Sequence, residues 1–210
     1  MTAKLSLTKE EIFEEAEICF NNCKLLVECL ADAAAKMDPE FSKENAMVQF
    51  ELMVQSLLFS QALADGVFSE EEKEFIKKLS KDNNLFDYII PEEGKSMTMD
   101  EAFALDIEKQ KEIAEAINTA LNNFADDFIM PLAMLDAAVA TNVLFDLSTD
   151  LSNLSVLLGA IDGEITEDEL EAFTNYCDEL IIGKWKDIKN IAEDIMEEAT
   201  ETADKAADEE

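Results

Sequence analysis

Apolar residues recur at intervals of three and four positions along most of the chain, which is the spacing of one face of an α-helix. Between Lys9 and Lys36 the recurring residues are Ile12, Ala16, Cys19, Cys23, Leu26 and Leu30. Only 5 Gly and 3 Pro interrupt the chain, and it contains no alternating run of the kind that strands require. The pattern therefore predicts an all-α protein of about seven to eight helices.

Glycine, proline and capping residues divide this pattern into individual helices. The predicted helices cover residues 9–36, 39–64, 69–81, 98–124, 131–161, 166–183 and 184–199, with a break expected near Leu147 and Ser148. Residues 82–97 are expected to form a loop with an apolar segment at 85–90. This segment either plugs the core or offers a patch to a partner, and the plug is favoured because exposed apolar patches are rare on monomers.

The organisation of the chain follows from the same pattern. We expect an N-terminal amphipathic helix at 1–38, an all-helical domain at 39–199 and an acidic, frayed tail at 200–210.

Two segments of the chain repeat one arrangement of residues. Each ends a helix, continues with Asp-Gly, a variable residue and an apolar residue, and starts the next helix with Ser or Thr and an acidic run. The paired positions are Asp65 and Asp162, Gly66 and Gly163, Phe68 and Ile165, Ser69 and Thr166, and Glu72 and Glu169. Gly permits the left-handed backbone that ends a helix, and Ser or Thr followed by Glu makes a capping box. The unit is a helix, an acidic turn and a helix, used twice, and the two hairpins are expected to pack as a pseudo-symmetric bundle.

The acidic turns share their spacing with the second half of an EF-hand calcium loop. The first half does not match, because its ligand positions would fall on Gln61 and Leu63 in one copy and on Leu158 and Ala160 in the other. These helix residues are not oxygen ligands of the required kind. The sequence therefore excludes a standard EF-hand in both copies.

The paired turns do resemble those of the tellurite-resistance TerB-like family. Its helical domains carry an Ala-x-Asp-Gly turn, an apolar residue and an acidic helix start in two copies, and the matching segments here are ALADGVFSEEE at 62–72 and GAIDGEITEDE at 159–169. The resemblance covers roughly residues 45–180; Gly159 stands where the family has Ala, and the long N-terminal helix has no family counterpart. The resemblance implies an all-α fold and a cluster of acidic side chains that binds a divalent metal. By position, these are Asp65, Glu72, Asp162 and Glu169.

A purely structural role explains the same four residues. Asp in such a turn accepts hydrogen bonds from the backbone amides just ahead of it, and Glu completes the helix cap. Metal binding requires in addition that the two copies face each other, so that a divalent cation relieves the repulsion among converging carboxylates. Ligands that are all oxygen favour Ca²⁺ or Mg²⁺ over Zn²⁺. Both interpretations are open from the sequence.

The charge composition excludes several classes of function. The chain has 49 acidic and 16 basic residues, a net charge of −33, and contains neither His nor Arg. Without an imidazole there is no Ser-His-Asp or Cys-His catalysis, and without a guanidinium no two-pronged grip on a phosphate. We therefore expect no enzyme, although hydrolysis assisted by a carboxylate-bound metal is a third hypothesis. The negative surface also argues against binding to nucleic acid.

The sequence also supports predictions of the cellular location of the protein and of its binding partners. No uncharged apolar run reaches the ~18 residues of a membrane span, the N-terminus lacks a signal-peptide pattern, and the cysteines fit reduced core residues. We expect a cytoplasmic, non-enzymatic, TerB-like stress-response protein that binds a divalent metal, a protein partner or both through the paired acidic turns. The alternative is an acidic interaction protein that acts as a polyanion mimic or scaffold without a specific metal site.

Overall fold

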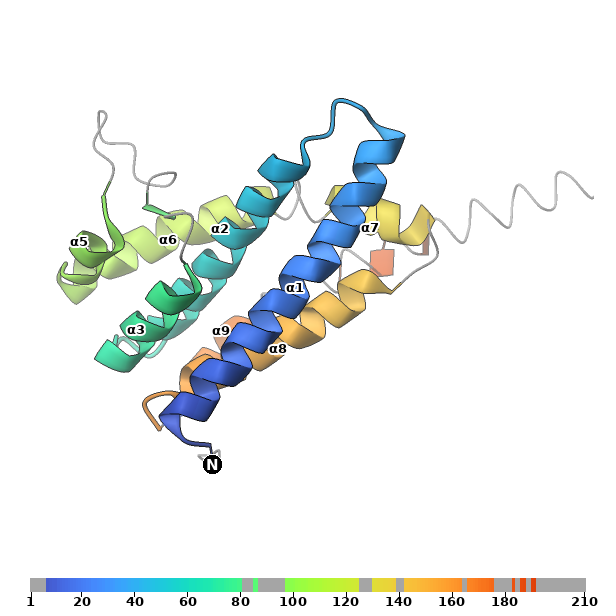
Figure 1. Ribbon diagram of the computed structural model, residues 1–210. Coiled ribbons are helices and arrows are strands. Elements are labelled where there is room, and N and C mark those ends of the chain that lie inside the picture. Colours follow the sequence, from blue (N-terminus) through green and yellow to red (C-terminus); the bar gives the residue numbers. More distant parts are fainter. Residues whose placement is uncertain are drawn as a thin grey trace, which may run out of the picture.

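The fold consists of helices. The computed structural model describes residues 7–80, 85–86, 97–124, 130–138, 142–163, 166–175, 183, 186–187 and 190–191. Eight helices with defined bounds lie in these ranges and no strand does, which confirms the all-α prediction. They are α1 (Lys9–Met37), α2 (Lys43–Ala62), α3 (Glu70–Leu79), α5 (Met99–Phe103), α6 (Ile107–Phe124), α7 (Met130–Ala138), α8 (Val143–Ala160) and α9 (Glu167–Asn175) (Figure 1).

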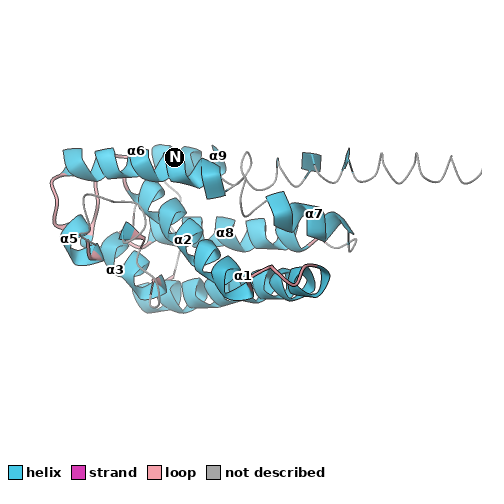
Figure 2. Ribbon diagram, turned by 90° about the horizontal axis from the view of Figure 1, so that it is seen from above, coloured by secondary structure: helices cyan, strands magenta, loops and turns pink. Residues whose placement is uncertain are grey.

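The helix α2 lies at the centre of the bundle. In Figure 2, α1 lies along one side of the molecule and α6 and α9 along the other, with α2 and α8 between them. α2 contacts α1, α3, α6, α8 and α9, and every residue from Glu51 to Leu63 is buried. A helix that is buried all round needs partners for its polar groups as well as for its apolar ones.

Polar side chains of α2 are paired with different segments of the chain. The Lys24 Nζ of α1 donates a hydrogen bond to Glu51 Oε1 at 2.6 Å. The backbone N of Leu85 donates to Gln55 Oε1 at 3.0 Å, and Gln61 makes two hydrogen bonds to α8. The burial of these polar groups is thus compensated by hydrogen bonds.

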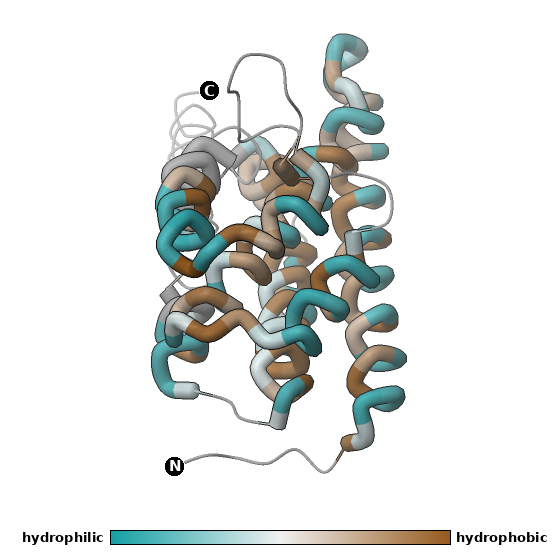
Figure 3. The backbone as a smooth tube through the Cα atoms, turned by 90° about the vertical axis from the view of Figure 1, so that its left-hand side faces the viewer, coloured by the Kyte–Doolittle hydropathy of each residue, from teal (hydrophilic) through white to brown (hydrophobic). Residues whose placement is uncertain are grey.

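The helix α1 is the amphipathic helix predicted for the N-terminal segment. It begins at a capping box in which Thr8 N donates to Glu11 Oε2 at 2.7 Å and Glu11 N donates to Thr8 Oγ1 at 3.3 Å. Figure 3 shows alternating hydrophilic and hydrophobic bands along its length. Its buried side contacts α8, α2, α7 and α3 and joins the same core as the other helices. Cys19 and Cys23 are buried and form no disulfide, as predicted, whereas Cys29 is exposed.

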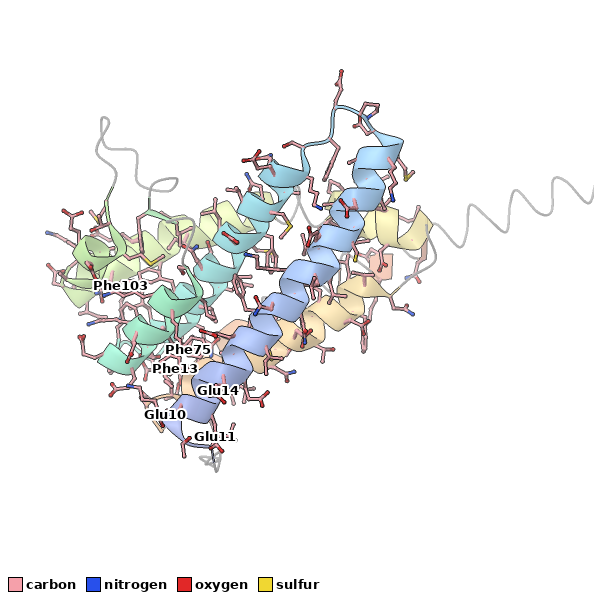
Figure 4. The ribbon with its side chains drawn as sticks, viewed as in Figure 1. Glu10, Glu11, Phe13, Glu14, Phe75 and Phe103 are labelled. Atoms are coloured by element: carbon pink, nitrogen blue, oxygen red, sulfur yellow. The ribbon has the colours of Figure 1, made fainter. Side chains whose placement is uncertain are left out.

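Phenylalanine side chains pack against one another in this core, and Phe20 of α1 stacks on Phe50 of α2 with 5.9 Å between the ring centroids. Phe13 of α1 stacks on Phe75 of α3, with 6.0 Å between the ring centroids (Figure 4). A larger cluster contains four rings with neighbouring centroids 5.0 to 6.1 Å apart: Phe59, Phe68, Phe86 and Phe103. Leu85 and Phe86 are both buried, so these two residues of the apolar loop segment plug the core, as favoured above. Residues 87–90 lie outside the described part of the chain.

The second helix begins at Lys43, not at Pro39 as predicted. The hydroxyl of Ser42 accepts a hydrogen bond from a first-turn amide at 3.2 Å and caps α2. Asp38 Oδ1 instead accepts from the backbone N of Glu40 at 2.9 Å. Asp38 therefore closes a local turn, and the chain needs a second cap to start the helix.

The single helix predicted over 98–124 is two helices. Thr98 opens α5 with a capping box, but α5 ends at Phe103. Asp106 Oδ1 then accepts a hydrogen bond from a first-turn amide of α6 at 3.1 Å, and the Gln110 side-chain amide donates to the Phe103 carbonyl at 3.1 Å. These two side chains stabilise the break between α5 and α6. The spacing of the apolar residues gives no indication of this break, because it remains helical across it.

The break expected at residues 147–148 falls between α7 and α8 instead. The carboxylate of the buried Asp136 accepts hydrogen bonds from Val143 N at 3.0 Å and Leu144 N at 3.4 Å, and so caps α8 from the preceding helix. Ser148 does not interrupt α8, because its hydroxyl donates to a carbonyl one turn earlier at 2.7 Å.

Two further predictions concern the ends of the chain and the membrane. The expected last helix, 184–199, and the acidic tail, 200–210, lie outside the described residues apart from 186–187 and 190–191. Among the described helices, α8 alone is long and apolar enough to cross a membrane. It carries Asp146 and Asp150, and more than half of it is buried inside the bundle. A core helix has the same character, so no clear membrane span is indicated.

Candidate functional site: the paired acidic turns

The first acidic turn joins α2 to α3. Gly66 has a φ of 83°, in the left-handed region that favours glycine, and its N donates to the Leu63 carbonyl at 3.1 Å. Asp65 is exposed, and its Oδ1 accepts a hydrogen bond from Val67 N at 2.8 Å. The turn is therefore closed by the aspartate in the way that the structural interpretation predicts.

A capping box starts α3 directly after this turn. Ser69 N donates to Glu72 Oε2 at 2.7 Å, and Glu72 N donates to Ser69 Oγ at 3.2 Å. Unlike most capping residues, Glu72 is almost completely removed from solvent, with 3% of its surface exposed. The adjoining Phe68 packs against Phe59 and Phe103 with centroid distances of 5.6 and 5.0 Å, which pins the turn to the core.

The second acidic turn joins α8 to α9 and repeats this geometry. Gly163 has a φ of 94°, and its N donates to the Ala160 carbonyl at 3.1 Å. Thr166 N donates to Glu169 Oε2 at 2.8 Å, and Glu169 N donates to Thr166 Oγ1 at 3.2 Å. Glu169 is also 3% exposed, whereas Asp162 is exposed. Residues 164–165, and with them the predicted pinning residue, lie outside the described range.

The helices that carry the two turns contact one another. α2 packs against α8 and α9, and α3 packs against α8. Gln61 Nε2 donates to the Ser155 carbonyl at 3.0 Å, and Ser155 Oγ donates to Gln61 Oε1 at 2.6 Å. The repeat aligns Gln61 with Leu158, so this bond joins non-equivalent positions. The pseudo-symmetry of the bundle stays a prediction.

Electrostatic interactions link the carboxylates of the two turns. Burial raises the pKa of Glu72 to about 8, and repulsion from Glu169 and Asp162 adds to this rise against the opposing hydrogen bonds from Ser69. Burial likewise raises the pKa of Glu169, opposed by hydrogen bonds from Thr166 and reinforced by repulsion from Asp65 and Asp162. Each buried glutamate thus interacts with acidic side chains of the other turn.

The potential metal ligands of the two turns are carboxylate oxygens, and some of these oxygens already accept hydrogen bonds within the turns. Glu72 Oε2 and Glu169 Oε2 accept the capping hydrogen bonds, and Asp65 Oδ1 accepts the turn hydrogen bond, so each carboxylate keeps its second oxygen outside these motifs. In the part of the chain that the structure describes, no three His, Cys, Asp or Glu side chains are grouped closely enough to hold a metal ion. The four carboxylates are therefore near enough to repel one another but do not form a ready-made ligand shell.

A lysine that the sequence analysis did not single out lies beside the first turn. A Cβ placed on Gly66 would lie 3.2 Å from the Nζ of Lys111, an α6 residue. An ammonium group is thus held next to the acidic turn. Lys111 lies far from the turn motif along the chain, so no local sequence pattern indicates that the two are close in space.

Comparison of the chain with protein-family models, curated proteins and solved structures finds no match.

Proposed function

We propose that this protein is a non-enzymatic, TerB-like stress-response protein whose paired acidic turns take up a divalent cation, Ca²⁺ or Mg²⁺ rather than Zn²⁺. The observation that carries the proposal is the pair of buried glutamates, Glu72 and Glu169, each repelled by carboxylates of the other turn. The stress-response setting follows from the motif resemblance.

The chemistry is an exchange of protons for a cation. With its pKa raised to about 8, Glu72 holds a proton at neutral pH. A divalent ion at the cluster supplies two positive charges, which offset the repulsion and allow both glutamates to ionise. Because each cap uses one carboxylate oxygen, the second oxygen is the one through which Glu72 or Glu169 would bind the ion. Binding would then tie the α2–α3 hairpin to the α8–α9 hairpin.

The proposal is tested by calorimetric titration of the full-length, chelator-treated protein with Ca²⁺ and Mg²⁺ in about 150 mM KCl, which suppresses diffuse ion binding. We expect saturable binding and a rise in melting temperature with ion concentration. Asp65→Asn with Asp162→Asn removes two charges but keeps the side-chain oxygen that the turn needs, so the ion effect should be lost and the ion-free stability mostly kept.

The matched control is Glu70→Gln with Glu167→Gln. These glutamates occupy the first positions of α3 and α9 and are both exposed. The control pair should keep the ion-induced stabilisation. Loss of the effect in both pairs, or its absence from the unmodified protein, would leave the turns as helix-capping devices alone.

A second candidate function is that of an acidic interaction protein without a specific metal site. The net charge of −33 favours it, since such a surface attracts basic partners over long range. Binding of basic proteins that is unchanged by Asp65→Asn and Asp162→Asn, in the absence of divalent ions, would support this function instead.

A further inference from the structure

The outward side of α1 carries an uncharged stripe. The most exposed residues between Glu15 and Asp32 are all uncharged, and they are Ile18, Asn21, Asn22, Leu25 and Cys29. Ile18 is 52% exposed and Leu25 is 59% exposed. In a chain with 31% charged residues, an exposed helix side with no charge over three turns is a feature to be explained.

Acidic side chains border the stripe. Asp146 and Asp150 lie on α8, and the Asn22 side chain hydrogen-bonds the Asp150 carboxylate, which places this edge of α8 beside the stripe. Glu14 and Glu15 stand before the stripe along α1, and Asp32 follows it.

On the other border the carboxylates already have cations. Lys78 pairs with Glu17 at 3.7 Å, and Lys43 pairs with Glu28 at 2.9 Å and with Asp32 at 2.7 Å. The α8 border therefore offers the stronger attraction to an incoming cation.

The charge around the stripe determines which kind of molecule can bind there. A second copy of this chain would bring another −33 and the same acidic borders, so the two copies would repel each other. A cationic amphipathic helix matches both the apolar residues and the acidic border of the stripe. Its apolar side can cover Ile18 and Leu25, while its Lys or Arg side chains reach the carboxylates of α8.

We propose that the uncharged stripe of α1, with the Asp146 and Asp150 border on α8, is the docking surface for a cationic amphipathic helix of a partner protein. The stripe from Ile18 to Cys29 rises about 16 Å, which matches roughly three turns of such a helix. This inference deepens the second candidate function by giving it a surface and a class of partner, and it does not require cation binding at the acidic turns.

The test uses the full-length protein in chelator and about 150 mM KCl, with a synthetic peptide of about 18 residues that places Leu on one helical side and Lys on the other. A peptide of equal composition in scrambled order has the same charge without the apolar side. We expect 1:1 binding of the amphipathic peptide by calorimetry and much weaker binding of the scrambled one.

Two variant pairs locate the interaction. Ile18→Ser with Leu25→Ser should lower the peptide affinity at least about tenfold, because two contacts with apolar side chains are lost. Met37→Ser with Met134→Ser removes apolar side chains that are 67% and 60% exposed but lie off the stripe, and the affinity should not change. All four side chains are exposed, so circular dichroism should show unchanged folds.

A footprint gives an independent readout. Bound peptide should slow the alkylation of Cys29, assigned by mass spectrometry of its proteolytic fragment. Equal affinity for both peptides, equal losses in both variant pairs or unprotected Cys29 would each overturn the proposal. Concentration-dependent dimers of the free protein that Ile18→Ser with Leu25→Ser abolishes would overturn it in favour of self-association. Failure of the cation titration would leave these measurements unaffected.

Discussion

Two capping boxes on the surface and two inside the bundle use the same hydrogen bonds with opposite effects on the carboxyl group. At the starts of α1 and α5, Glu11 and Glu101 are exposed, and the hydrogen bonds from Thr8 and Thr98 lower their pKa. At the starts of α3 and α9 the same bonds are present, yet burial raises the pKa of the glutamate. The cap stabilises the helix start in all four places, and the surroundings decide whether it holds a charge or a proton.

The largest expected effect is a pH dependence of stability that Glu72→Gln removes. The folded pKa of about 8 lies above the unfolded value, so Glu72 contributes stability that is fully present below about pH 4.5 and lost as pH rises through 8. The free energy of unfolding of the ion-free protein should fall by several kcal/mol over this range. Gln keeps an oxygen acceptor for the cap without an ionisable group, so urea unfolding at pH 5 and pH 9 should show a flatter dependence in the variant.

The surface box supplies the control for this measurement. Glu101 has a lowered pKa, so its contribution is present above the unfolded pKa and is lost as pH falls through the folded value. Glu101→Gln should therefore leave the fall in stability between pH 5 and pH 9 intact. If Glu72→Gln loses as much stability between pH 5 and pH 9 as the wild-type protein does, the buried capping box is not the source of the pH dependence.

A smaller difference is expected when the capping hydroxyls are removed. Ser69→Ala should cost about 1–2 kcal/mol, because Glu72 N loses its acceptor and the buried carboxyl loses a hydrogen bond. Thr8→Ala at the exposed box should cost about 0.5–1 kcal/mol, since water can replace the lost partner. The measurement is the shift in urea midpoint at pH 7. Equal shifts at the two boxes would mean that burial adds nothing to the cap.

The smallest expected effect concerns the lysine beside the first turn. Lys111→Gln removes a positive charge next to Gly66, so the affinity of the turns for Ca²⁺ or Mg²⁺ should rise a few-fold at low salt and less at physiological salt. Lys109→Gln, on the same helix but paired with Asp106 at 4.0 Å, serves as the matched control and should leave the affinity unchanged. A lower affinity in Lys111→Gln would mean that the ammonium supports the site rather than competing with the cation.

The contrast between local and distant interactions also explains what the sequence could predict. Both acidic turns, their glycines and the two capping boxes predicted after them are present, because each motif lies within a few consecutive residues. The burial of Glu72 and Glu169 could not be predicted, since it depends on how helices from both halves of the chain pack. The break before α8 was misplaced for the same reason: its cap, Asp136, comes from the preceding helix. The boundary at Asp38 was wrong although it is local, because a turn and a helix start compete for the same residue type.

The central position of α2 has a consequence for how the protein avoids incorrect packing. An apolar helix buried on all sides would accept several neighbours in several registers, since apolar contacts have little directional preference. Its polar side chains restrict this freedom, because Glu51 requires Lys24 of α1, Gln55 requires the backbone at Leu85 and Gln61 requires Ser155 of α8. An alternative docking would leave buried groups unpaired at about 1–3 kcal/mol each. Three segments far apart in the chain are thus each matched to one place along a single helix.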